Sequence, residues 1–175
     1  MADAGPPDPR TYPPMQGDER ATLSGFLTFQ RQTLAWKCAD LSADDLARRS
    51  ISCSTMSLLG LVRHMAEVER IWFRDVLSAE KTTPYFYDDA DRDGEFNRVE
   101  ADGAQVESGF AAWKAEIAFA DEFVANAPNL DVVGTNRHGE TMSLRWVLVH
   151  MIEEYARHNG HADLMRQAID GAVGE

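Results

Sequence analysis

The sequence predicts an all-α protein, a four-helix bundle built as a single domain. Four long segments repeat their apolar residues at the three- and four-residue spacing of an amphipathic helix. The turn-forming residues gather between these segments. At 175 residues, 44% of them hydrophobic, the chain is large enough to bury one core. Amphipathic helices of this kind bury their apolar faces against one another as a bundle.

The first helix is preceded by a proline-rich stretch. Residues 1–17 hold five of the seven prolines, which predicts a flexible or draped tail ahead of the domain at 18–175. The helix itself is expected over about 18–39, where Asp18 and Glu19 suit the positive end of the helix dipole.

The second long helix follows a short one. A brief helical segment is expected at 43–48 with Ser42 as its N-cap. The long helix then covers about 57–79. Residues 81–103 are rich in Asp and turn formers, and they form the long connection to the third helix. We expect this connection to be mainly a solvated loop rather than a cover over a pocket.

A short segment connects the last two helices. The third helix is expected over about 104–126, and residues 129–141 form either a small hairpin or a loop. The fourth helix begins near Met142, with Thr141 or Ser143 as its N-cap.

Composition excludes several classes of function. A formal net charge of -12 argues against a nucleic-acid partner, because binding there needs clustered Lys and Arg. It gives no support for an anionic membrane surface, and no run is long and apolar enough to span a bilayer. The N-terminus lacks the pattern of a signal peptide. Two cysteines do not make a disulfide framework, so we expect a cytoplasmic protein with reduced thiols.

The fourth helix carries an unusual polar stripe. Steps of four, four and three residues place His150, Glu154, His158 and His161 within an arc of roughly 80°. Burying these groups unpaired on an apolar face costs several kcal/mol each. A bound divalent metal would compensate that cost.

The second helix offers a further ligand, His64, on or beside its apolar face. Three protein ligands plus water is the pattern of a catalytic zinc site. Two pairs on the fourth helix have the required spacing of four, His150 with Glu154 and Glu154 with His158, and spacing alone does not choose between them.

Non-metal explanations exist for several of these residues, and one of them is a surface position for His161 near the end of its helix. His64 could be a hydrogen-bonded core histidine, and Glu154 could pair with Arg157 or Arg145. His138, in a turn-like segment, is expected to be solvated. Among metal architectures, the chain has no H-E-x-x-H motif and no Glu-x-x-His pair, so a mononuclear site is what remains.

Two segments carry a resemblance to a known family. They are T-M-S-L-L-G-L-V-R-H-M-A-E-V-E-R-I-W-F at 55–73 and M-S-L-R-W-V-L-V-H-M-I-E-E-Y-A-R-H-N-G-H-A-D-L-M-R at 142–166. Both resemble the DinB-like superfamily, which includes the mycothiol-dependent maleylpyruvate isomerases and the bacillithiol transferases. The likeness extends from about residue 18 to 170 and looks typical of an actinobacterial branch of that superfamily.

The resemblance implies a ligand set. Members hold one divalent metal by a histidine of helix two and two residues four apart on the last helix, which are Glu-x-x-x-His in the mycothiol-dependent isomerases. Carried over, this pattern implies His64, Glu154 and His158 as ligands. It gives His150 an outer or packing role, and it lets His161 orient a ligand or face the opening of the site.

The resemblance also implies chemistry. We expect a metal-dependent thiol S-transferase of the mycothiol type, acting on small electrophiles in detoxification. Zinc is the expected metal, with nickel or iron as alternatives, and a low-molecular-weight thiol is the co-substrate. The chain lacks the additional C-terminal domain of the isomerases, which argues against maleylpyruvate isomerisation. The competing hypothesis is a metal-binding stress or sensor bundle without turnover. Pairing as a homodimer is a further hypothesis.

Overall fold

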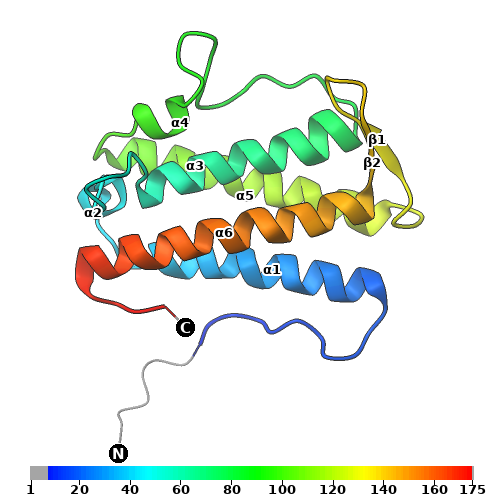
Figure 1. The fold of residues 1–175 in the computed structure, drawn as a ribbon, viewed down its shortest axis with the longest axis horizontal. Helices are drawn as coiled ribbons and strands as arrows, with labels where there is room; N and C mark the ends of the chain where they lie inside the picture. Colours follow the sequence, from blue (N-terminus) through cyan, green and yellow to red (C-terminus); the bar gives the residue numbers. More distant parts are fainter. Residues whose placement is uncertain (1–7, 175) are drawn as a thin grey trace, which may run out of the picture.

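The computed structural model describes residues 8–174, and within them the all-α prediction is confirmed. Four long helical segments run lengthwise beside one another (Figure 1). α1 packs mainly on α6, and α3 mainly on α5. The long segments are α1 (Glu19–Cys38), α3 (Leu58–Glu69) continued by the π-helix η1 (Arg70–Leu77), α5 (Gly103–Asn126) and α6 (Leu144–Asp170).

Short elements join these helices. They are α2 (Ala43–Ala47), α4 (Gly94–Asn97), β1 (Val133–Thr135) and β2 (Thr141–Ser143). The segment predicted as either a hairpin or a loop is a hairpin, with Gly134 opposite Met142. Gly134 lies against the carbonyl oxygen of Val76 so closely that a Cβ would collide with it. The hairpin therefore packs directly on the end of η1.

Side-chain caps begin the helices as their polar residues predict. Asp18 accepts from the backbone N–H of Ala21 and caps α1, and Ser42 caps α2 in the same way. Of the two candidate caps for the last helix, Ser143 accepts from Trp146 N–H. Thr141 instead lies in β2, so α6 begins at Leu144.

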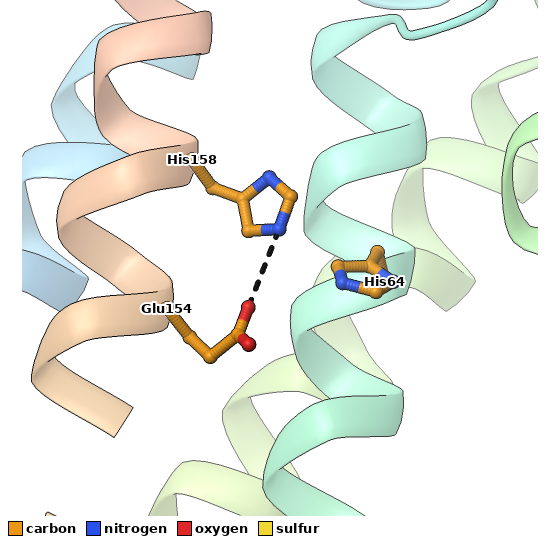
Figure 2. A group of neighbouring side chains, drawn as sticks. All are labelled: His64, Glu154 and His158. Carbon is orange, nitrogen blue, oxygen red and sulfur yellow. Dashed lines mark ion pairs between the residues drawn. The ribbon is translucent and has the colours of Figure 1, made fainter. Parts of the chain in front are cut away.

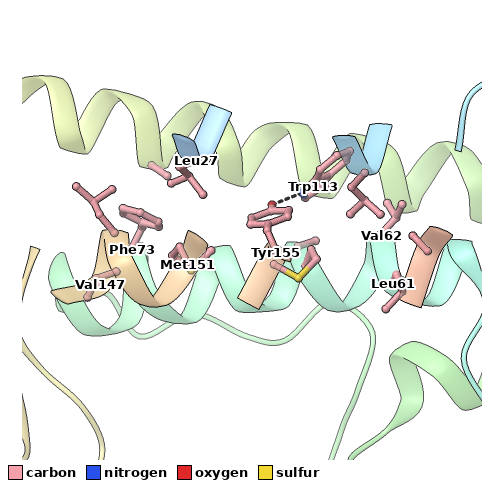
Figure 3. Packing of buried hydrophobic residues seen from close by; sticks show 14 of the residues in the cluster. Leu27, Leu61, Val62, Phe73, Trp113, Val147, Met151 and Tyr155 are labelled. Carbon is pink, nitrogen blue, oxygen red and sulfur yellow. Dashed lines mark hydrogen bonds between the residues drawn. The ribbon is translucent and has the colours of Figure 1, made fainter. Parts of the chain in front are cut away.

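The core fills the space between the four long helices (Figure 3). Its members are almost all aliphatic or aromatic, and they include Leu27, Leu61, Val62, Phe73, Trp113, Val147, Met151 and Tyr155. A polar contact lies inside it, where Trp113 Nε1 donates to the Tyr155 hydroxyl at 2.7 Å. Buried Trp and Tyr need such a partner.

The second long helix changes its geometry part-way. It was predicted as one helix over about 57–79, but from Arg70 onward its turns widen to the π form. The N–H of Ser78 bonds the carbonyl of Phe73, five residues back, at 3.0 Å. Wide turns of this kind re-aim side chains and are frequent at functional sites.

The segments outside the bundle are tied to it. Glu67 accepts from the backbone N–H groups of Tyr85 and Phe86 at 2.6 and 2.8 Å, which anchors the long connection to α3. The Arg10 guanidinium lies 4.6 Å from the ring centroid of Phe29 on α1. The predicted tail therefore runs over α1 from residue 8 onward, and its first seven residues lie outside the described part. No helix in residues 8–174 is long and apolar enough to cross a membrane.

Candidate metal centre

Three polar side chains converge between α3 and α6 (Figure 2). His64 projects from α3, and Glu154 and His158 project from successive turns of α6. One ligand atom from each lies within 4.8 Å of the others. His158 Nε2 is 3.6 Å from Glu154 Oε2, and the His64 and His158 ring centroids are 4.9 Å apart. The predicted ligand set is thus brought together by the fold.

The donor set fits a divalent ion. Zinc bonds of about 2.1 Å place tetrahedral ligands roughly 3.4 Å apart, close to the His158–Glu154 separation. All three donors lie within 4.8 Å of one another, so small side-chain movements complete such a group. The three side chains are 13–24% exposed, so the group is partly open to solvent. Two imidazoles, one carboxylate and an open position form a catalytic zinc pattern.

The protonation state of His158 also favours metal binding. Burial, together with the nearby His64 and His161, lowers the pKa of His158 to about 4. The ring is therefore neutral at pH 7. Neutral imidazole is the form that binds metals, so ligation needs no proton displacement at this ring.

Each histidine in the group has a neighbouring polar group at its Nδ1 atom. His64 Nδ1 lies 3.3 Å from Glu95 Oε1, and His158 Nδ1 lies 3.5 Å from His161 Nδ1. A proton on Nδ1 of each ring satisfies these contacts and leaves the Nε2 lone pair for a metal. Metal-binding histidines are commonly oriented in this way.

His150 lies outside the converging group. Its Nε2 is 3.6 Å from Oε1 of Glu154, on the opposite side of that carboxylate from His158. Two indoles enclose the ring: Trp72 at 4.7 Å and Trp146, nearly parallel, at 5.0 Å between centroids. The geometry brings His158, rather than His150, toward His64.

The non-metal partners considered for Glu154 are engaged elsewhere. Arg157 pairs with Glu153, and Arg145 pairs with Glu19 and Asp131. Within residues 8–174 no Arg or Lys forms an ion pair with Glu154, and its charge partners there are His150 and His158, each at 3.6 Å.

The remaining candidates lie apart from the group. His138 is exposed in the turn between β1 and β2. Both cysteines are free. Cys53 is exposed, whereas Cys38 is buried and its thiol pKa is raised to about 12, which keeps it protonated.

Two cavities open beside the Trp72 ring. One, of about 740 Å³, lies among η1, the connection after it and the tip of the hairpin. The other, of about 430 Å³, lies between Trp72, Trp146 and β2. Trp72 lines both, and its ring also contacts the His150 ring.

Sequence patterns alone did not identify three residues that lie around the centre. Trp146 precedes His150 by four residues and Trp72 follows His64 by eight, so helical spacing was a usable signal for both. Glu95 lies 31 positions from His64 in the long connection. No spacing rule links it to α3.

An all-α bundle with this donor set between two of its helices defines a protein of the DinB-like class. The family model described as mycothiol S-transferase matches residues 22–171, and the chain belongs to that family. The family is part of the DinB-like superfamily, which confirms the resemblance seen in the sequence. No curated protein matches the chain.

Proposed function

We propose that this protein binds one divalent metal, zinc in the first instance, through His64, Glu154 and His158. With it the protein would transfer a low-molecular-weight thiol of the mycothiol type to small electrophiles. The observation that carries the proposal is the convergence of the three donors from α3 and α6. Membership of the mycothiol S-transferase family supports the choice of thiol transfer over other metal chemistry.

A divalent ion would supply positive charge that favours the thiolate form of a bound thiol and polarises an electrophile. The protein's own residues set the conditions for this chemistry. Neutral His158 offers its Nε2 without losing a proton, and Glu154 contributes the one negative charge of the ligand set. The proposed transfer does not use the free cysteines, which are not part of the converging group.

The indoles of Trp72 and Trp146 form an apolar wall on the Glu154 side. Their ring centroids lie 5.3 Å apart. Such a wall excludes water from the thiol and offers contact area to an apolar electrophile. The two cavities lined by Trp72 give the substrates room to approach.

The first test is metal content by mass spectrometry on tag-free protein. Wild type is compared with His64→Ala, Glu154→Ala and His158→Ala, and with His138→Ala as a matched control in the exposed turn. We expect about one equivalent of metal in wild type and in the control, and loss in the other three. Retention of metal by all three would overturn the ligand assignment.

The second test separates transfer from mere metal binding. Metal-loaded protein is mixed with mycothiol and a fluorogenic electrophile, and conjugation is followed with and without a chelator. Transfer predicts saturation in mycothiol and loss of the rate on chelation. Metal binding without saturable thiol affinity would instead support a stress or sensor bundle.

A further inference from the structure

Glu95, in the four-residue helix α4, reaches the metal centre from the long connection. Its Oε1 lies 3.3 Å from Nδ1 of His64, and the residue is only 6% exposed. The Asp-rich part of the same connection is largely solvated, as expected. Glu95 is therefore a buried carboxylate, placed against a candidate ligand by a connection whose Asp-rich part faces solvent.

We propose that Glu95 is a positioning residue for the metal centre. By accepting the Nδ1 proton of His64, it fixes the tautomer and the ring orientation that present Nε2 to the ion. The inference rests on the proposed metal site and adds a residue to it. A carboxylate behind a metal-binding histidine raises the basicity of the ring and commonly contributes 10- to 100-fold in metal affinity.

The anchoring of α4 does not depend on Glu95. A Cβ on Gly60 would lie 2.8 Å from the Phe96 ring, so Gly60 lets α4 pack directly on α3. A Cβ on Gly94 would lie 2.5 Å from the carbonyl oxygen of Phe86. Arg98, just after α4, pairs with Asp88 at 2.7 Å. Close packing and ion pairs therefore hold this segment in place without a contribution from Glu95.

Burial of Glu95 is poorly compensated by the fold itself. Within residues 8–174 its Oε2 has no hydrogen-bond partner, and His64 is the group at hydrogen-bond distance from Oε1. The charge of Arg63 acts on Glu95, but no hydrogen bond joins them, and Arg63 Nε also lacks a partner. A carboxylate buried in this way costs stability. A function at His64 accounts for its presence.

His64 in turn depends on Glu95 for its orientation. The ring lies 5.3 Å from the Phe96 ring and 4.9 Å from the His158 ring, contacts that fix its position more than its rotation. Glu95 is the acceptor at hydrogen-bond distance from Nδ1. With the proton held there, the lone pair of Nε2 is left free to bind the ion.

The experiment compares two substitutions of similar size. Glu95→Gln keeps an oxygen that accepts the Nδ1 proton, whereas Glu95→Met keeps the volume and removes the acceptor. Asp88→Asn is the control, because it weakens the Arg98 pair in the same connection without touching His64. Zinc affinity is measured by competition with a chromogenic chelator. The tautomer of His64 in metal-free protein is read from side-chain ¹⁵N shifts.

We expect Glu95→Met to lower zinc affinity 10- to 100-fold and to remove the Nδ1–H tautomer of His64. Glu95→Gln should keep that tautomer and lose less affinity, and Asp88→Asn should match wild type. Equal losses in the Gln and Met variants, or wild-type affinity in the Met variant, would overturn the inference. Absence of zinc binding in wild type would instead refute the proposed metal site.

Discussion

Two carboxylates in the helical bundle, Glu69 and Glu154, have opposite surroundings. Glu69 is fully buried and receives two 2.7 Å bonds from Arg31, while the Tyr155 hydroxyl donates to it at 2.8 Å. Glu154 is 21% exposed, and its ion-pair partners within residues 8–174 are two histidines, each at 3.6 Å. The first carboxylate has its donors at close range, and the second does not.

The difference separates a structural polar group from a candidate functional one. In the Glu69 network, Tyr155 also accepts from Trp113 and Arg31 also pairs with Asp121, so each polar group is bound by others of the protein. Around Glu154, within the described part of the chain, the contacts are long and no Arg or Lys is paired with it. A buried polar network that is already satisfied stabilises the fold, whereas one left open has capacity for a ligand.

Substitution of Glu69 should have the largest effect on stability. Glu69→Gln leaves Arg31 buried with only the exposed Asp121 to offset its charge. Removing one partner of a buried pair is strongly destabilising, and we expect a loss of about 3 kcal/mol in the free energy of unfolding. Urea denaturation measures it, and metal affinity of the folded fraction should be unchanged. An unchanged unfolding midpoint would contradict a structural role for this pair.

The matching substitution at Glu154 should have the opposite profile. Glu154→Gln removes the charged ligand, so we expect zinc affinity to fall by more than about 100-fold, or ~2.7 kcal/mol. Because Glu154 has no Arg or Lys partner, the free energy of unfolding of metal-free protein should change by less than about 0.5 kcal/mol. Isothermal titration with zinc and urea denaturation in chelator give the two values. Comparable instability in both Gln variants would remove the distinction.

The features of the fold and of the candidate site that the sequence predicts are those set by local patterns. Asp18, Ser42 and Ser143 act within three residues of themselves, so their capping roles follow from sequence. The stripe of His150, Glu154 and His158 follows from helical spacing, but its pairing depends on which neighbour α6 faces. Spacing left that choice open, and the family resemblance was needed to make it.

Long-range partners were not predictable. Arg31 and Glu69 are 38 residues apart, and charged residues on a helix are usually expected on its solvated face. Glu95 meets His64 only because α4 packs on α3 at Gly60. The π turns from Arg70 were hidden as well, since an amphipathic pattern does not distinguish them from α turns. These features depend on tertiary packing, which the periodicity of a single sequence does not report.

The pH dependence of stability should reveal the buried, neutral ring of His158 in the metal centre. Burial lowers the pKa of His158 from 6.5 to about 4, so between these values the unfolded chain binds a proton that the native state does not. Stability of metal-free protein should therefore fall as pH decreases from about 6.5 to about 4, by on the order of 2 kcal/mol. Denaturation in chelator at several pH values measures it. The slope should be shallower in His158→Gln, and equal slopes would contradict the burial of a neutral ring.

The smallest effect is expected at an exposed pair next to the centre. Arg157 pairs with Glu153 on the outer face of α6, and both side chains are more than half exposed. Solvent screens such pairs, so Arg157→Gln should change the free energy of unfolding by less than about 0.5 kcal/mol. Zinc affinity should also stay within about threefold of wild type, because the donors themselves are untouched. A tenfold change would mean that nearby charge controls the centre as much as the converging donors, and the contrast between Glu69 and Glu154 would then describe only part of it.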